Sequence, residues 1–136
     1  MATVTVTRRV HFNAAHRLHS NALSDEENAR TFGPCNNPNY HGHNYELEVS
    51  VTGQPDETTG YVADLSEIKR IVEREVLTRF DHRNLNLDLP EFVDLNPTVE
   101  NIVTVIWQLL EHKLPAQLTR LVLWETPRNY AVYEGS

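Results

Sequence analysis

The sequence has little of several features that define specialised classes of protein. Its 136 residues include a single cysteine, so a disulfide framework is excluded. Lysine and arginine number 12 against 19 acidic residues, and the formal net charge of −7 disfavours the broad basic surface of a nucleic-acid-binding protein. Its apolar runs are far shorter than the roughly 18 residues of a membrane-spanning helix. We therefore expect neither a nucleic-acid partner nor a membrane partner.

Other absences narrow the organisation of the chain. The N-terminal residues lack the basic and apolar segments of a secretory signal, which together with the lone cysteine predicts a cytoplasmic protein. There is no internal repeat, charge block, interdomain linker or glycine-rich dinucleotide motif. With 40% hydrophobic and 23% charged residues the composition is that of a globular protein, and we expect one domain over residues 1–136.

Hydrophobic periodicity predicts four strands. Apolar and polar residues alternate in an N-terminal strand and in a second strand that begins near His41, after a long polar loop. The loop covers 18–40 and contains a turn of helix over 24–30. The expected strands are 4–12, 44–53, 118–125 and 130–133, and the second begins at His41 if it includes the His-Gly-His run.

Two helices are predicted between the second and third strands. Asp64, with Glu67 three residues later, has the pattern of a capping box for a helix that ends near Arg79. Thr98 or Asn96 caps the second helix, which carries one apolar face. The order ββααββ predicts an α+β fold in which two helices cover one face of an antiparallel four-stranded sheet. The free edges of such a sheet favour an oligomer that closes it into a β-barrel.

The run His41-Gly42-His43 is the densest chemical signal. Alternate residues of a strand point to one face about 6–7 Å apart, so both imidazoles can bind one metal ion. His16, just beyond the first strand, would lie beside His43 if the two strands pair antiparallel. Three histidines with an open fourth position are typical of a catalytic Zn²⁺ site.

The third histidine decides this interpretation, because a His-x-His pair on an exposed strand often binds nothing. His11, His19 and His112 have no such companions, and we interpret them as ordinary solvent-facing or packing residues. His19 is the alternative third ligand if His16 points elsewhere.

A cysteine and two acidic positions are further candidates. Cys35 lies six residues before His41; it is either a small loop residue or a base or nucleophile whose thiol pKa a nearby dication lowers. Asp81 and His82 form an acid–base pair or a structural one. Glu125 ends an apolar strand, where a buried carboxylate needs a ligand that offers donors.

Five runs of the sequence resemble the 6-pyruvoyltetrahydropterin synthase family, which includes the bacterial 6-carboxytetrahydropterin synthases of queuosine synthesis. They occur in order over nearly the whole chain, and the most specific is a cysteine separated by five residues from His-Gly-His. The runs are FNAAH (12–16), FGPCNNPNYHGHNY (32–45), DHRNLN (81–86), PTVEN (97–101) and WET (124–126).

The resemblance implies a fold and a set of roles. The fold is the tunnelling fold (T-fold), whose ββααββ subunits close into trimeric β-barrels that stack in pairs as a homohexamer with active sites between subunits. Without the resemblance, Glu100 is explained as a favourable charge at a helix N-terminus. The implied residues are His16, His41 and His43 for Zn²⁺, Cys35 as general base with Asp81 and His82 as a relay from a neighbouring subunit, and Glu125 for the pterin with support from Glu100 and Thr98.

The implied activity is that of a lyase. It converts 7,8-dihydroneopterin triphosphate to 6-pyruvoyl-5,6,7,8-tetrahydropterin with elimination of triphosphate, in tetrahydrobiopterin biosynthesis. The alternative product is 6-carboxy-5,6,7,8-tetrahydropterin, formed with loss of acetaldehyde and triphosphate in queuosine biosynthesis. The five residues between Cys35 and His41 resemble the pyruvoyl-forming type. Asn13 and Tyr40 depart from the family's usual serine and glycine, and Tyr40 beside the metal bears on the product.

Two other classes of function stay open at this point. A non-catalytic metal-binding assembly module would bind zinc without turnover, and a zinc hydrolase would use a metal hydroxide without needing Cys35. The anionic tail of the substrate requires basic residues, for which the candidates are Arg8, Arg9, Arg17 and Arg30.

Overall fold

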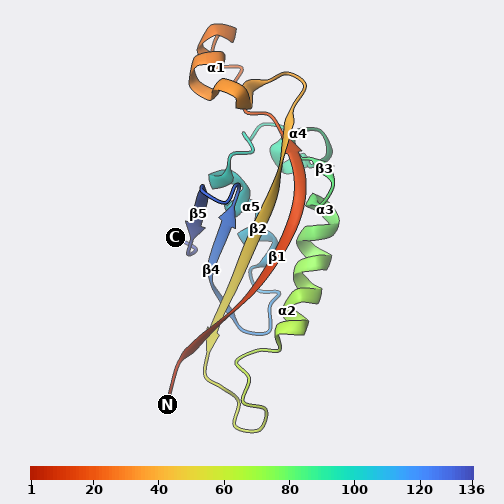
Figure 1. Cartoon of the computed structure of the whole chain (residues 1–136). Helices are drawn as coiled ribbons and strands as arrows, with labels where there is room; N and C mark the ends of the chain where they lie inside the picture. The colour runs from red at the N-terminus through yellow and green to blue at the C-terminus, as the bar shows by residue number, and fades with distance from the viewer.

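The computed structural model describes residues 1–136 as a long, twisted sheet with helices along one side (Figure 1). Short 3-10 helices cover Gly33–Asn36 and Pro90–Phe92, and a π-helical turn over Glu73–Leu77 joins α2 to α3. The elements are β1 (Val4–His16), α1 (Asp25–Phe32), β2 (His41–Gly53), α2 (Leu65–Val72), α3 (Thr78–Phe80), β3 (Arg83–Asn84), α4 (Leu85–Asp88), α5 (Val99–Leu110), β4 (Gln117–Trp124) and β5 (Tyr130–Tyr133).

The sheet has five strands in the order β3-β1-β2-β4-β5. Strands β1, β2, β4 and β5 are antiparallel neighbours, as predicted. Strand β3 was not predicted: its two residues pair in parallel with Ala14 and Ala15, and two residues are too few for a periodic pattern. Strand β1 also runs past Phe12, because its pairing with β2 continues until His16 lies opposite His41.

The helix that follows β2 and its loop is continuous from Leu65 to Phe80 and ends near the predicted residue. The predicted capping box at its start is wrong. Asp64 Oδ1 accepts a hydrogen bond from the Ser66 amide at 2.9 Å, but the Glu67 side chain does not return to the cap. A single side-chain hydrogen bond therefore caps this helix.

A capping box occurs instead at α1, where only a turn of helix was predicted. The Ser24 hydroxyl accepts from the Glu27 amide at 3.1 Å, and the Glu27 carboxylate accepts from the Ser24 amide at 3.0 Å. These reciprocal bonds stabilise an eight-residue helix that lies beyond the ends of β1 and β2 (Figure 1). Helix α5 begins as predicted, because Thr98 Oγ1 accepts from the Asn101 amide at 3.2 Å.

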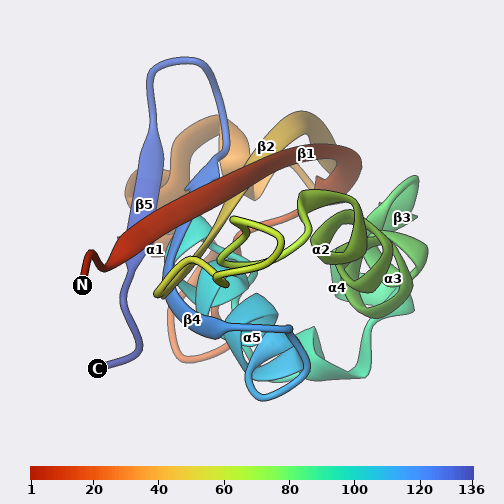
Figure 2. The ribbon, with the colours of Figure 1, turned by 90° about the horizontal axis from the view of Figure 1, so that it is seen from below.

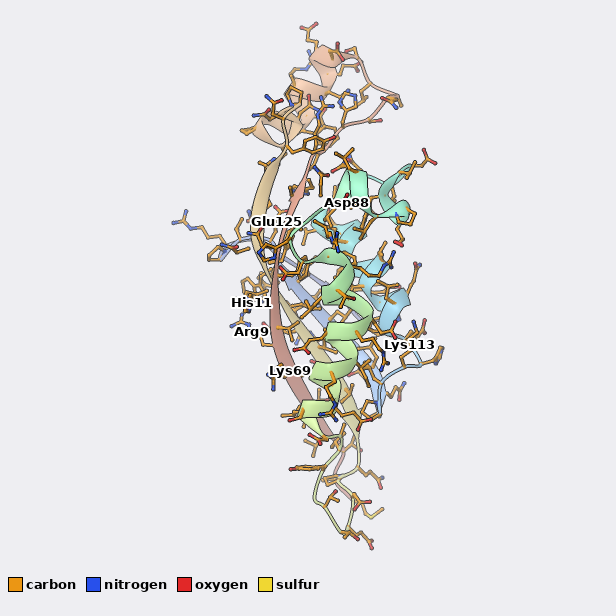
Figure 3. The ribbon with its side chains drawn as sticks, turned by 90° about the vertical axis from the view of Figure 1, so that its right-hand side faces the viewer. Arg9, His11, Lys69, Asp88, Lys113 and Glu125 are labelled. Atoms are coloured by element: carbon orange, nitrogen blue, oxygen red, sulfur yellow. The ribbon has the colours of Figure 1, made fainter.

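Helices α2 and α5 lie on the same side of the curved sheet (Figure 2) and bury its apolar face. The opposite face is polar: Thr7 and Ser50 are joined across the strands at 2.7 Å, and Arg9 binds Glu48 at 3.3 Å. Arg9 and His11 extend from β1 away from Lys113 (Figure 3). No helix combines the length and apolar character needed to span a membrane.

Candidate active site

Three histidines converge where the end of β1 meets the start of β2. The Nε2 atoms of His16 and His41 are 3.0 Å apart, and the ring centroid of His43 lies 5.1 Å from that of His16 and 4.9 Å from that of His41. One nitrogen from each ring lies within 4.8 Å of the others, and no carboxylate or thiol joins the group. Three protein ligands are the number that catalytic zinc sites use. The predicted histidine set is therefore arranged to bind a metal ion.

The register of the two strands differs in one detail from the prediction. His16 lies opposite His41, and Ala14 is the residue opposite His43. His16 therefore meets His43 diagonally, and all three rings still converge. This pairing favours glycine at position 42, because a Cβ atom there would lie 3.2 Å from the backbone oxygen of Ala14, which is a tight contact.

One hydrogen bond fixes the tautomer of His16. Its Nδ1–H donates to the backbone oxygen of Pro97 at 2.7 Å, so its Nε2 is left with the lone pair that a metal requires. Burial, and then the neighbouring His41 and His43, lower the pKa of His16 to about 4. The ring is therefore neutral at pH 7, which is the form that coordinates metals. Buried His41 Nδ1 and His43 Nε2 have no hydrogen-bond partner, as expected of a site built for a further ligand.

Cys35 lies on the 3-10 helix that is tied to the end of β1. The Leu18 amide donates to Cys35 O at 2.8 Å, and Arg17 Nε donates to Asn36 O at 2.9 Å. Burial and the nearby Glu125 carboxylate both raise the pKa of the thiol. The protein's own groups thus act against the lowered pKa that we expected, and that expectation depends on a bound cation.

A cleft of about 560 Å³ is bordered by His43 and Glu125, whereas His16 and His41 do not line it. Glu125 follows β4, and the pairing of Glu46 with Trp124 places it opposite Tyr45 when the register is extended by one residue. The cleft is lined by Arg9, Gly42, His43, Asn44, Glu46, Trp124, Glu125, Thr126 and Pro127. One histidine of the cluster and a carboxylate therefore border the same cleft.

Asp81 and His82 lie at the opposite edge of the sheet. Asp81 Oδ1 accepts from the Asn13 amide at 2.9 Å and from His82 Nδ1 at 3.0 Å, and the first of these bonds lowers the pKa of Asp81. His82 has a φ of 61°, and its side chain is 83% exposed. The pair precedes β3, so β1 and β2 separate it from β4. Its contacts are with β1, and the fold of one chain does not bring it to Cys35 or Glu125.

Thr98 and Glu100 lie outside the cleft. The Thr98 hydroxyl caps α5, and Glu100 is exposed in the first turn of that helix, where a negative charge is favourable. Thr98 follows Pro97, whose backbone oxygen holds His16. Within one chain, this segment contacts the metal cluster through Pro97.

The remaining histidines and arginines also have definite positions. His19 lies outside the cluster, with its Nδ1 3.0 Å from the side-chain nitrogen of Asn36, so it does not replace His16. Arg9 lines the cleft and is paired with Glu46 and Glu48. The other predicted positions are Arg17 beside the Cys35 helix, Arg30 near Glu26, and exposed His11 and His112.

Two residues near the cluster were missed from the sequence. Pro97 binds His16 from 81 positions away, and no local pattern predicts such a contact. Tyr45 has a fully buried hydroxyl without a partner and lies two residues after His43 on the same face of β2. The alternation that identified His41 and His43 also indicates Tyr45.

Comparisons with known proteins agree with this geometry. The family model described as 6-pyruvoyl tetrahydropterin synthase matches residues 5–136. The 6-pyruvoyl tetrahydrobiopterin synthase of Homo sapiens is 46% identical over 131 residues, covering 96% of this chain and 90% of that protein. The structure of Caenorhabditis elegans 6-pyruvoyl tetrahydropterin synthase has a TM-score of 0.94 and 43% identity, covering 100% of this chain and 98% of that one.

A further relative is named for a different activity. The dihydroneopterin monophosphate aldolase of Pyrococcus furiosus is 42% identical over 87 residues, covering 62% of this chain and 69% of that protein. The synthase matches extend over nearly the whole sequence, and they include every residue of the histidine cluster within the matched range. The chain belongs to the 6-pyruvoyl tetrahydropterin synthase family.

Proposed function

We propose that this chain, acting as one domain, converts 7,8-dihydroneopterin triphosphate to 6-pyruvoyl-5,6,7,8-tetrahydropterin and triphosphate. Family membership supports the reaction. So do the relatives that match over nearly the whole chain, because they are named as 6-pyruvoyl tetrahydrobiopterin or tetrahydropterin synthases. The observation that carries the proposal is the convergence of His16, His41 and His43, with His43 bordering the same cleft as Glu125. This arrangement suits a substrate with an oxygen-rich side chain at one end and ring N–H donors at the other.

Zn²⁺ is the metal that we propose for the histidine cluster. Three neutral imidazoles are a usual donor set for catalytic zinc, and the Pro97 oxygen holds His16 with its Nε2 available. When bound, zinc supplies Lewis acidity that polarises the hydroxyl groups of the substrate side chain. The histidines orient that side chain toward the segment that carries Cys35.

Cys35 is the proposed base that removes a proton from the substrate side chain. Since burial and Glu125 raise its pKa, the thiol requires a nearby positive charge to ionise near neutral pH. The Asp81 carboxylate holds the His82 imidazole by the bond to Nδ1, which leaves Nε2 to exchange a proton. Asp81 and His82 therefore act as the relay that returns a proton.

A neighbouring subunit is the proposed source of that relay. Three strand spacings of about 4.8 Å separate β3 from β4, which places the two strands about 14 Å apart. Asp81 and His82 precede β3, and Glu125 follows β4, so the pair is distant from Glu125 within one chain. Both side chains are exposed beside the outer edge of β1, which is the edge that faces away from β2. Only Ala14 and Ala15 of that edge have a strand partner, which is β3. Pairing of free edges between subunits would close the sheet into a barrel and place the relay of one subunit at the cleft of the next. We propose a homohexamer of two such trimers.

Glu125 is the proposed anchor of the pterin ring. Its carboxylate borders the cleft and accepts hydrogen bonds from the amino and ring N–H groups. Thr98 supports the site through Pro97, and exposed Glu100 is the second residue proposed to support pterin binding. The five-residue separation of Cys35 from His41 favours the pyruvoyl product over the 6-carboxy product.

The test is product analysis by mass spectrometry after incubation with 7,8-dihydroneopterin triphosphate. Chelation and Cys35→Ala should each lower turnover at least about 10²-fold, while the exposed-site control His112→Ala should keep the wild-type rate. Unchanged rates after both treatments would contradict the proposal. Acetaldehyde among the products would establish the 6-carboxy reaction, and zinc binding without turnover would establish the assembly module.

A further inference from the structure

Tyr45 carries a buried polar atom that the proposed chemistry leaves unused. Three buried side-chain atoms have no hydrogen-bond partner, and they are His41 Nδ1, His43 Nε2 and the hydroxyl of Tyr45. The first two belong to the metal-binding rings. Tyr45 is 0% exposed, so water does not satisfy its hydroxyl in the manner of a surface tyrosine. Buried hydroxyl groups normally have a partner, and the partner here is missing from the chain itself.

Packing fixes the position of the Tyr45 ring. It stacks on Phe12 with ring centroids 4.9 Å apart and planes inclined by 15°. Its centroid lies 5.8 Å from that of His43 and 6.3 Å from that of His16. Because Phe12 and both histidines hold the ring, the hydroxyl is a preorganised group.

The strand pairing places Tyr45 between the histidine cluster and Glu125. His43 is two residues back along the same strand face, and the extended β2–β4 register sets Glu125 opposite Tyr45. Opposed residues of neighbouring strands have Cβ atoms about 5 Å apart. A tyrosine hydroxyl keeps its proton at neutral pH, so this group is available as a hydrogen-bond donor.

We propose that the Tyr45 hydroxyl donates a hydrogen bond to N5 of the bound 7,8-dihydropterin. The inference rests on the proposed function, in which Glu125 holds one end of the ring and the histidine cluster faces the side chain at the other. Tyr45 lies between these groups but does not line the cleft, so a ligand that spans them would have to open the contacts that cover its hydroxyl. The imine N5, next to the carbon that bears the side chain, is then the acceptor nearest to it.

The bond would be stronger during the reaction than before it. When a base removes a proton from the side-chain carbon attached to the ring, electron density moves onto N5. A fixed donor at N5 stabilises that charge, so its loss lowers kcat more than it raises KM. Tyr45 donates a hydrogen bond only, and its proton stays on the phenol oxygen.

The test compares Tyr45→Phe with Tyr133→Phe. Tyr45→Phe keeps the stack on Phe12, and Tyr133 is a control that packs on Trp107 with centroids 5.2 Å apart. The measurements are zinc per chain, melting temperature of the metal-free protein, the dissociation constant of 7,8-dihydroneopterin, and kcat and KM. We expect Tyr45→Phe to keep its zinc and its melting temperature, and to lose about 10- to 100-fold in kcat with a smaller change in KM. Tyr133→Phe should match wild type.

The outcomes separate this inference from the function on which it rests. If wild type turns over the substrate and Tyr45→Phe has the same kcat, only the assignment of Tyr45 fails. A rise in KM alone would also overturn it, since the donor would then act on the ground state. A fall in melting temperature together with loss of zinc would show that the hydroxyl is structural. If wild type neither binds 7,8-dihydroneopterin nor turns over the triphosphate, the proposed function fails and this inference fails with it.

Discussion

Acid should destabilise the metal-free protein through His16. The folded protein holds this fully buried ring with its pKa lowered to about 4, against an ordinary value of 6.5 in the unfolded chain. Between these two values the unfolded state binds more protons than the folded state, so the free energy of unfolding falls as the pH falls. Each pKa unit corresponds to about 1.4 kcal/mol, and a shift of about 2.5 units gives a loss of about 3 kcal/mol between pH 7 and pH 4.

Urea denaturation at half-unit pH steps measures this loss. The stripped wild-type protein should lose stability progressively below pH 6.5. His16→Asn, whose side-chain nitrogen stands where Nδ1 does and keeps a donor for Pro97 O but does not titrate, should lose about 3 kcal/mol less over the same range. His112→Asn, altered at an exposed histidine, should follow wild type. Parallel curves for wild type and His16→Asn would refute the claim that burial of a neutral imidazole is costly here.

Three further predictions concern the metal, the loop before β2 and the first helix. His43→Ala should abolish stoichiometric zinc binding in a metal assay, whereas His19→Ala should retain it, and equal retention would contradict the histidine set. Tyr40 has a φ of 68°, so Tyr40→Gly should raise the free energy of unfolding by up to about 1 kcal/mol in urea, and a decrease would show that its side chain outweighs the backbone strain. Ser24→Ala should remove the Ser24–Glu27 capping box and cost about 1 kcal/mol, seen as faster hydrogen exchange in α1; unchanged exchange would argue against it.

The sequence predicts the fold well where periodicity is strong. Four strands and the two main helices follow from alternation and from the apolar face of 99–110, since those patterns report burial directly. Prediction from the sequence fails where an element is very short or where its structure depends on contacts with distant residues. Two-residue β3 has no pattern of its own, and the capping pattern at Asp64 is chemically as good as that at Ser24, although only the latter closes in the fold.

The histidine cluster was predictable because its members lie on strands with clear alternation. Antiparallel pairing of two alternating strands brings residues at their adjoining ends together, so His16, His41 and His43 share one face whether His16 lies opposite His41 or opposite His43. The pKa of Cys35 was not predictable, because it depends on burial and on Glu125, which is 90 positions away in the sequence and is brought near by β4. The placement of Asp81 likewise depends on a bond to the Asn13 amide across the edge of the sheet.

The hydrogen bond between His16 and Pro97 makes the docking of a helix a condition of metal affinity. Pro97 stands one residue before the cap of α5, so a displacement of that helix by less than 1 Å would weaken the bond that selects the His16 tautomer. By reciprocity, an ion that binds this tautomer must tighten the start of α5 by the same free energy. Binding of the ion and ordering of the start of α5 are therefore thermodynamically coupled.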